Sequence, residues 1–282
     1  MQVFREIKAL QAYLEIKKCE GATIGLVPTM GALHDGHLSL VKKSIQDNHI
    51  TVTSIFVNPV QFNNPDDLIR YPGTLEEDLT LLGEVGDHVV FYPEQQEMYA
   101  DKPVVSMDFG ELERRMEGEF RPGHFNGVGI VVAKLLGIAK PHKAYFGQKD
   151  LQQFAVIQQL VKDLSYDVEL KCMPIIREPD GLALSSRNRR LSPAERKKAP
   201  IFYEALKMAE KLYLQGNSID FIGTEVRNLF DSGEVILEYF EIVDACSLEK
   251  IEDTTKKNVA MCIAGYVGEI RLIDNVIIGN EY

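Results

Sequence analysis

Two histidines, His34 and His37, are the residues of this sequence best placed to do chemistry. An apolar run, residues 24–27, precedes them, and a glycine stands close before each, at Gly31 and Gly36. Side chains three residues apart share one face of a helical turn, so both imidazoles can point into one pocket. There they would donate hydrogen bonds to charge that develops on a transferring phosphate group.

A metal site is the second interpretation of this pair. The zincin pattern, His-Glu-x-x-His, separates its histidines by four positions, whereas these two are three apart. The third interpretation is two surface histidines in a loop. The adjacent glycines and the preceding apolar run argue against that reading, because His at such positions commonly acts in a functional site.

The elements that must position the histidines are a strand, a tight turn and a helix. We predict a strand at residues 23–27 and a helix that continues through residues 38–47. In an open α/β sheet, ligands bind where the carboxyl ends of strands meet the amino ends of helices. Backbone N–H groups at that point favour an anion such as phosphate. Gly31 and Gly36 would let the backbone approach a nucleotide closely.

The segment from Pro28 to His37 resembles the signature of the pantothenate synthetase (pantoate–β-alanine ligase) family. That family belongs to the nucleotidyltransferase superfamily, whose "HIGH" motif is matched here by His34-Asp-Gly-His37. Further segments resemble family motifs and stand in the family order: residues 56–62, 121–125, 146–150 with Gln152 and Gln153, and 180–188. The resemblance covers nearly the whole chain.

The resemblance implies an ATP-dependent condensation of (R)-pantoate with β-alanine. Pantoyl adenylate would form first with release of diphosphate, and the amine of β-alanine would then displace AMP to give pantothenate. The family uses Mg²⁺ and is generally homodimeric. The physical logic agrees, since a carboxylate is a poor acyl donor until adenylation supplies a better leaving group, and the protein must then mainly position anions and neutralise their charge.

The resemblance also implies a role for individual residues. His37 would be the proton donor, with His34 beside it on the phosphates. Gln61 and Gln153 would hold pantoate, and Gln61 would also meet β-alanine. The ATP site would comprise Met30, Gly31, Ala32, Leu33, His34, Asp35, Gly36, His37, Gly147, Gln148, Lys149, Asp150, Ile176, Leu184, Ser185, Ser186 and Arg187. The stretch from Ser185 to Arg187 stands where relatives carry a mobile "KMSKS" loop.

Three positions depart from the family pattern. Asp35 and Gln148 stand where the family usually has Glu, and Gly73 stands where it commonly has Arg. These differences leave the expected chemistry intact, and the roles of those three side chains stay open.

Several of these residues also have simpler interpretations. Gln61 could be a solvated loop residue, Lys149 a solvated lysine, Asp150 only a helix cap, and Arg187 part of an ordinary polar turn. Asp78 could bind Mg²⁺ or merely be solvated. The metal ligands therefore stay unknown at this point.

Composition bounds the class of protein. The 282 residues carry a formal net charge of −11, which argues against generic nucleic-acid binding. No apolar run has membrane-spanning length, and the charged amino-terminal residues lack a signal-peptide core, so we expect a cytoplasmic enzyme that does not enter a membrane. The four cysteines are far apart and form no C-x-x-C pair, which is typical of reduced, structural residues.

The pattern of elements predicts an α/β fold: a Rossmann-like, doubly wound parallel sheet followed by a smaller α+β carboxyl-terminal domain. We place the nucleotide- and pantoate-binding domain at residues 1–176 and a lid or dimer-associated domain at residues 177–282. Helical spacing of Val3, Ile7, Leu10 and Leu14 predicts an opening helix.

Further strands are predicted at residues 50–57, 87–92, 144–146, 168–176, 235–245, 259–266 and 270–273. Capping boxes at Thr74-Leu-Glu-Glu77 and Ser192-Pro-Ala-Glu195 predict two helix starts.

Two rival functions stay open. The first is a nucleotidylyltransferase that releases an adenylylated product, against which the Gln61 and Gln153 motifs argue. The second is a non-catalytic nucleotide-binding or regulatory protein, against which the complete set of polar residues argues.

Overall fold

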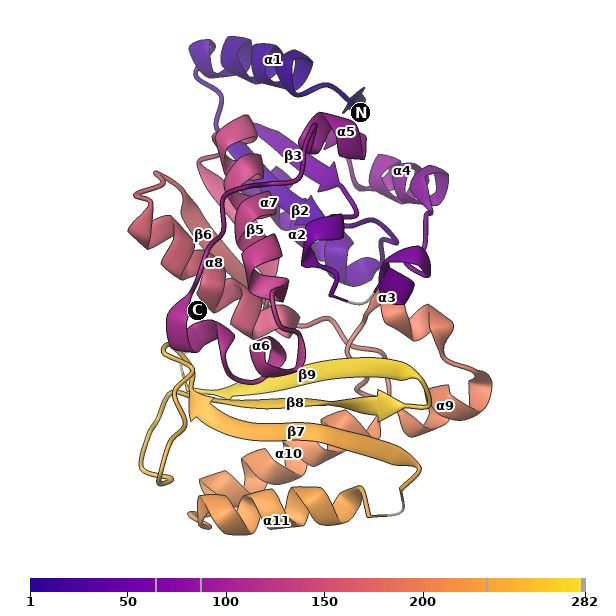
Figure 1. Ribbon diagram of the computed structural model, residues 1–282, viewed down its shortest axis with the longest axis vertical. Helices are drawn as coiled ribbons and strands as arrows, with labels where there is room; N and C mark the ends of the chain where they lie inside the picture. Colours follow the sequence, from indigo (N-terminus) through magenta and orange to yellow (C-terminus); the bar gives the residue numbers. More distant parts are fainter. Residues whose placement is uncertain (64, 87, 232, 280–282) are drawn as a thin grey trace. The chain divides into compact units, whose positions relative to one another are not determined.

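The structure is a computed structural model that describes residues 1–63, 65–86, 88–231 and 233–279 (Figure 1). The chain forms two compact units. The first comprises residues 1–147 and 156–173, and the second comprises residues 148–155 and 174–282. The boundary predicted at residue 176 lies three residues after Met173, and the inclusion of residues 148–155 in the second unit was not predicted. The functional division into a binding domain and a lid stays a prediction.

A parallel sheet forms the centre of the first unit. Its strand order is β1-β4-β3-β2-β5-β6, and every pair in it is parallel. The strands are β1 (Gln2–Phe4), β2 (Ile24–Thr29), β3 (Ile50–Ile55), β4 (Val89–Phe91), β5 (Lys143–Gly147) and β6 (Glu169–Met173). Chain order reverses direction between β2 and β5, which makes the end of β2 the switch point where such sheets bind ligands. The predicted doubly wound class is confirmed.

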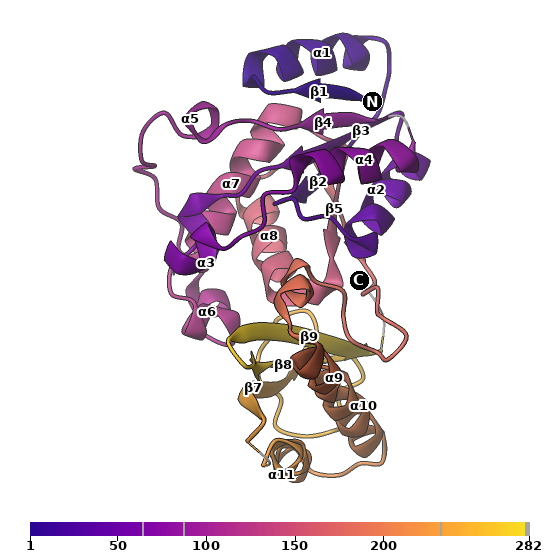
Figure 2. The same ribbon diagram turned by 90° about the vertical axis from the view of Figure 1, so that its right-hand side faces the viewer.

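Helices cover both faces of this sheet. Helices α2 (Asp35–Asp47) and α4 (Leu75–Val85) pack against one face, where Leu33, Val41 and Leu82 are fully buried. Figure 2 shows α7 (His124–Ala139) on the other side of the strands. The remaining short elements are α1 (Ile7–Cys19), η1 (Pro59–Gln61), α3 (Pro65–Ile69), α5 (Gln95–Met98), η2 (Gly110–Glu113) and α6 (Glu117–Phe120). Helix α7 is buried along most of its length, as its apolar sequence predicts.

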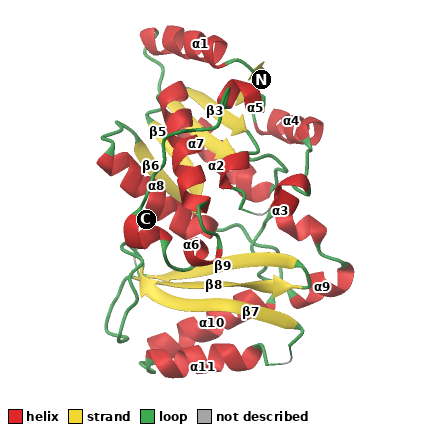
Figure 3. Cartoon of the chain, viewed as in Figure 1, coloured by secondary structure: helices red, strands yellow, loops and turns green. Residues whose placement is uncertain are grey.

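The second unit contains an antiparallel sheet in the order β7-β8-β9, formed by Val235–Asp244, Val259–Val267 and Ile270–Ile278. Its longer helices are α10 (Ile201–Leu214) and α11 (Ile219–Leu229), which share one apolar core with the three strands (Figure 3). Its other elements are η3 (Gln148–Asp150), the start of α8 (Leu151–Asp163), η4 (Ser186–Arg190) and α9 (Pro193–Lys198). Segregated helices and antiparallel strands confirm the predicted α+β class.

Three predicted elements differ from the structure, one of them the strand predicted at residues 168–176, which is observed as the shorter β6 and ends at Met173. Val3 lies in β1 and not in the opening helix, which begins at Ile7. Residues 2–4 pair with the edge of β4 through backbone hydrogen bonds. This pairing decides the conformation of Val3, although the spacing of the apolar residues favours a helix. Strand β9 continues to Ile278, although the prediction ended at residue 273. Asp274 and Asn275 suggested the end of a strand, yet both are buried and hydrogen-bonded.

Only one of the two predicted capping boxes is formed. Ser192 and Glu195 exchange hydrogen bonds between their side chains and backbone N–H groups, as predicted. Helix α4 does begin after Thr74, but in the described structure that side chain makes no capping bond. Its hydroxyl donates instead to the Asp78 carboxylate. The predicted strand at residues 87–92 is observed as β4, and residue 87 lies outside the described residues.

Within the described residues, no helix has the length and apolar character needed to cross a bilayer. None of the four cysteines forms a disulfide in this part of the chain.

Candidate active site

The turn after β2 adopts an unusual backbone conformation. Gly31 has φ +82° and Ala32 has φ +49°, so two successive residues lie in the left-handed region. A Cβ on Gly31 would lie 3.0 Å from the Asp78 carboxylate and 3.2 Å from an Ile55 methyl group. Both the backbone angle and the tight space therefore favour glycine at position 31.

Asp78, on α4, holds this turn. Its Oδ2 accepts a hydrogen bond from the Ala32 N–H at 2.9 Å, and its Oδ1 accepts one from the Leu33 N–H at 2.7 Å. The Thr74 hydroxyl donates to Oδ2 at 3.2 Å. The side chain is fully buried. Both oxygens thus bond to the backbone of the turn, which gives Asp78 a structural role, and no observation tests the suggestion that it also binds Mg²⁺.

This contact also limits the predicted anion site. The N–H groups of Ala32 and Leu33 are directed to Asp78 and not to a bound anion. The amides left for a phosphate are those of the first turn of α2, which begins at Asp35. Asp35 is exposed, and Gly36 lies within the helix, so its predicted role in close backbone approach stays untested.

The two histidines do lie side by side at the start of α2. His34 is the N-cap residue and His37 belongs to the first turn. Their ring centroids are 4.1 Å apart with planes inclined by 38°. Both rings are partly buried. The helix N-terminus and two imidazoles thus converge on one small region, which suits a group that carries negative charge.

Gln61 lies in η1, directly after β3, and its side chain is buried. Its Oε1 accepts from Asn58 at 2.9 Å, which fixes the orientation of the amide. Its Nε2 then points to the sulfur of Met30, at 3.3 Å. The structure therefore brings Gln61 next to the segment that carries the histidines. It is not the solvated loop residue of the simpler interpretation.

Asn58 is itself held in place. Its Nδ2 donates to the Gly127 carbonyl at 3.1 Å, and its Oδ1 accepts from the Tyr99 hydroxyl at 3.0 Å. Burial raises the pKa of Tyr99 to about 12, so the hydroxyl keeps the proton that it donates. A Cβ on Gly127 would lie 2.6 Å from the Gln61 backbone, so α7 approaches η1 this closely only because residue 127 is glycine.

His124 supports the same segment from α7. Its Nδ1 lies 2.9 Å from the Gln61 carbonyl, and its Nε2 lies 3.1 Å from an Arg121 guanidinium nitrogen. A carbonyl only accepts and a guanidinium only donates, so the ring carries its proton on Nδ1. Glu117 lies 3.6 Å from Arg121 and balances its charge. This chain of contacts fixes the backbone that bears Gln61.

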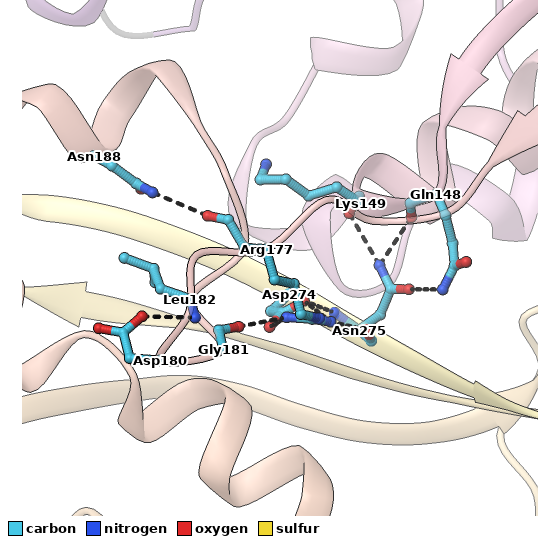
Figure 4. Close-up of polar contacts among 10 residues, drawn as sticks. Gln148, Lys149, Arg177, Asp180, Gly181, Leu182, Asn188, Asp274 and Asn275 are labelled. Atoms are coloured by element: carbon cyan, nitrogen blue, oxygen red, sulfur yellow. Dashed lines mark hydrogen bonds and ion pairs between the residues drawn. The ribbon is translucent and has the colours of Figure 1, made fainter. Parts of the chain in front are cut away.

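In the second unit, residues 176–184 form a small hairpin. Arg177 and Ala183 pair as an antiparallel bridge, and the Leu184 N–H donates to the Ile176 carbonyl at 3.0 Å. The turn closes at Gly181, with φ +91°. Figure 4 shows Asp180 and Gly181 at this turn. Ile176 and Leu184, both predicted to meet the nucleotide, are therefore brought together as backbone partners.

The predicted "KMSKS"-like stretch follows this hairpin. Ser185 caps η4, and its Oγ accepts from the Arg187 N–H at 3.3 Å. Ser186 is buried, and Asn188 donates to the Ala183 carbonyl at 2.9 Å. The stretch is thus a capped helical turn anchored to the hairpin.

The segment after β5 carries the other predicted residues of this unit. Gln148, Lys149 and Asp150 form η3, and the Lys149 ammonium lies 3.7 Å from the Asp150 carboxylate. Gln153 lies in the first turn of α8, and the neighbouring Gln152 is buried. The side chain of Lys149 is only 16% exposed.

The predicted residues thus fall into two sets, one in each unit. The first unit brings together the stretch 30–37 and Gln61. The second brings together Ile176 and Leu184, which are followed by Ser185 as the cap of η4 and by Ser186 and Arg187 within η4. The η3 segment and Gln153 belong to the same unit. Asn58 and His124 were not predicted to serve the site, and Asp78 was considered only as a Mg²⁺ ligand and not as the residue that holds the turn. Asn58 and His124 stand in motifs that the sequence did display, whereas nothing local marks Asp78.

A comparison with protein families identifies the chain. The model of the pantoate-beta-alanine ligase family matches residues 2–277. The chain belongs to this family. The pantothenate synthetase of Bacteroides fragilis is 45% identical over 283 residues, which cover 98% of each chain. That of Cytophaga hutchinsonii is 47% identical over 277 residues, which cover 96% of this chain and 97% of the relative.

Solved structures of family members have the same fold. A pantothenate synthetase from Thermus thermophilus aligns with a TM-score of 0.93 at 40% identity, over 99% of this chain and all of the other. The pantoate–β-alanine ligase of Francisella tularensis, described as complexed with beta-gamma ATP and β-alanine, aligns with a TM-score of 0.80 at 35% identity, over 98% and 97%. The predicted family, fold and enzyme class are therefore confirmed: the chain is a pantoate–β-alanine ligase.

Proposed function

We propose that this ligase works through pantoyl adenylate, with ATP as co-substrate. The pantoate carboxylate attacks the α-phosphorus of ATP and displaces diphosphate. The β-alanine amine then attacks the acyl carbon and displaces AMP, leaving pantothenate. Family membership supports the overall reaction, and the Francisella tularensis relative supports ATP and β-alanine as ligands. The rival nucleotidylyltransferase would stop after the first step.

The pair of imidazoles at the start of α2 carries this proposal. His34 and His37 stand at a helix N-terminus, with ring centroids 4.1 Å apart, so both can donate to phosphate oxygens as charge develops. We assign His37 as the proton donor and His34 as its neighbour on the phosphates. Residues 30–33 and 35–36 complete this part of the nucleotide site.

We propose that Gln61 binds pantoate and meets β-alanine. Its amide is already oriented by Asn58, and its Nε2 faces a thioether, which is a weak acceptor. A pantoate oxygen would be a far better acceptor for the same donor. Gln153 is proposed as the second amide on pantoate. Neutral amides suit a carboxylate that must remain nucleophilic, because they donate hydrogen bonds to it without neutralising its negative charge.

In the second unit, Lys149 and Arg187 are the proposed cations for the phosphates. Lys149 supplies a compact charge, and Arg187 supplies a fork of donors that matches a diphosphate leaving group. The remaining proposed nucleotide contacts of this unit are Gln148, Asp150, Ile176, Leu184, Ser185 and Ser186. Gly147, at the end of β5 in the first unit, is also a proposed contact. The structure supports this by capping the turn at Ser185 and pairing Ile176 with Leu184.

We propose Mg²⁺ as part of the ATP substrate. Among the described residues no group of three or more His, Cys, Asp or Glu side chains is arranged to hold a metal ion. Asp78, the acid considered from the sequence, is occupied by two amides. Mg²⁺ commonly binds through substrate phosphates with few protein ligands, and that mode fits this donor set.

A homodimer is also proposed, from the resemblance of the sequence to its family, and so is a cytoplasmic location, which is the expectation from the composition of the sequence. Light scattering of the purified chain measures the first, and a mass close to one chain at working concentration would contradict it. Fractionation of cells that produce the full chain measures the second.

The deciding experiment is product release from ATP, Mg²⁺ and D-pantoate, with and without β-alanine. We expect AMP and pantothenate only when β-alanine is present. Steady release of diphosphate with accumulation of a free adenylylated acid would favour the nucleotidylyltransferase. Tight ATP binding with no turnover would favour the non-catalytic reading.

A further inference from the structure

Two adjacent polar residues, Asp274 and Asn275, interrupt the apolar sequence of β9. Both are almost completely buried, with 5% and 2% of their surface exposed. They lie inside a strand that pairs with β8 on both sides of them, from Ile270 to Ile278. Buried polar side chains of this kind are retained only where they find partners.

The partners of Asn275 lie in the η3 segment. Its Nδ2 donates to the carbonyls of Gln148 and Lys149, at 2.9 Å and 3.0 Å, and its Oδ1 accepts from the Gln148 side chain at 3.0 Å. Figure 4 shows the Lys149 carbonyl facing Asn275 while the Lys149 side chain points away from it. One amide therefore fixes the backbone from which the proposed phosphate-binding lysine extends.

The partner of Asp274 is Arg177, at the base of the 176–184 hairpin. The two form a bidentate pair with distances of 2.6 Å and 2.9 Å. The same guanidinium donates to the Gly181 carbonyl at 3.0 Å and to the Asn275 carbonyl at 3.1 Å, and it lies 4.1 Å above the ring centroid of Tyr203. Asp274 thus fixes the hairpin that leads into the Ser185–Arg187 turn.

Stability alone does not account for this arrangement. Burial raises the pKa of Asp274, and Arg177 and the Lys149 charge only oppose that effect. A buried ion pair is often no more stabilising than apolar residues of the same size. The pair does fix the orientation of Arg177 relative to β9, because a bidentate contact permits little variation in geometry.

We propose that Asp274 and Asn275 are positioning residues for the first step of the reaction. Neighbouring positions on one strand fix η3 and the 176–184 hairpin, and so set the spacing between Lys149 and the Ser185–Arg187 turn. This inference rests on the proposed function, in which both segments hold ATP phosphates.

The test is the Asn275→Leu variant, which keeps the approximate volume and removes the donors to both carbonyls. We expect the KM for ATP to rise about tenfold or more, because the two hydrogen bonds to the carbonyls and the one from the Gln148 side chain are lost. The rate of diphosphate release should fall, while the KM for β-alanine stays unchanged. A residue that served stability alone would not change one substrate's KM selectively.

The matched control is Glu238→Gln. Glu238 of β7 accepts a hydrogen bond at 2.8 Å from Arg271, which lies in β9 together with Asn275. Both side chains are largely buried. This pair joins β9 to β7 and makes no described hydrogen bond to η3 or to the hairpin. We expect a lower unfolding midpoint with an unchanged KM for ATP.

A second variant keeps the test decisive if Asn275→Leu does not fold. In Asn275→Asp, an ionised carboxylate would face two carbonyl oxygens, whereas its protonated form can donate to one of them. We expect the ATP KM of this variant to fall toward that of the wild type as the pH is lowered. Equal changes in all substrate KM values, or none beyond the Glu238→Gln control, would overturn the inference. Absence of pantothenate from the wild type would instead overturn the proposed function.

Discussion

The turn after β2 and the segments held by β9 are fixed by hydrogen bonds of opposite polarity. In the first unit, the Asp78 carboxylate accepts from the backbone N–H groups of Ala32 and Leu33. In the second unit, the Asn275 amide donates to the backbone carbonyls of Gln148 and Lys149. Each side chain is buried and bonds to two successive backbone groups.

The difference follows from what each segment presents. The turn after β2 presents two N–H groups, so an acid can hold it. The η3 segment presents two carbonyls, and only a donor can hold those. Asp and Asn have nearly the same shape, so the two sites differ in chemistry more than in size. Exchange of these residue types is therefore a sharp test of the comparison.

The largest expected effect is that of His37→Ala, in the region where side chains meet the reacting phosphate. We expect adenylation to fall by about 100-fold to 10,000-fold, the usual contribution of a proton donor. Diphosphate release with ATP, Mg²⁺ and pantoate measures this. The control is His49→Ala, an exposed histidine that bonds to Thr23, which should leave the rate within about twofold. Near-normal turnover in a folded His37→Ala enzyme would contradict the role.

The next effect is that of Asp78→Ala, which leaves two buried N–H groups without their acceptor. We expect the free energy of unfolding to fall by roughly 2–5 kcal/mol. Turnover should fall by about 100-fold as the histidines lose their position. Asp78→Asn keeps one acceptor oxygen and should lie between the wild type and Asp78→Ala in both measurements. If Asp78→Asn and Asn275→Asp both match the wild type in unfolding free energy and turnover, the opposite polarity of the two sets of hydrogen bonds does not affect stability or activity.

A smaller effect is expected from Gly127→Ala, which tests how Gln61 is placed by backbone contact. The new Cβ would lie 2.6 Å from the Gln61 backbone, so η1 must shift. We expect a loss of about 1–3 kcal/mol in unfolding free energy and a higher KM for pantoate.

The matched control for Gly127→Ala is Gly137→Ala, in the same helix. A Cβ there meets nothing within 4 Å, and alanine should stabilise α7 by about 0.5–1 kcal/mol. If both substitutions stabilise the protein, close packing of α7 on η1 does not constrain Gln61.

The smallest effect concerns Asp180, at the tip of the hairpin that Arg177 anchors. The Arg196 guanidinium, 2.6 Å away, holds the pKa of Asp180 below its ordinary value of 3.8. Because the pKa of Asp180 is lower in the folded protein than in the unfolded chain, its ionised carboxylate stabilises the fold at pH values above 3.8. This contribution is lost as the pH falls through the pKa of the folded state. Both groups are partly exposed, so Asp180→Asn should cost less than about 1 kcal/mol near neutral pH.

Urea midpoints at neutral pH and at about pH 3 measure this, and the difference between wild type and Asp180→Asn should shrink at the lower pH. A difference that grows on acidification would show that the ion pair is not its source.

The parts of the site predicted from sequence are those set by local order. Residues 28–37 join a strand to a helix, so neighbours in sequence fix where both histidines lie. Ser192 and Glu195 form their capping box for the same reason. Thr74 shows the limit of such reasoning, because its hydroxyl found a better partner in Asp78 and the expected box did not form.

The sequence by itself determined the family, the doubly wound class and the position of the histidine pair, because apolar periodicity and contiguous motifs are local properties. Tertiary structure alone decided that Asp78 holds the turn 45 residues before it and that Asn275 holds carbonyls 127 and 126 residues away. It also decided that β9 runs through two buried polar residues. A polar side chain shows its type in the sequence, but its partner is known only once the chain is folded around it.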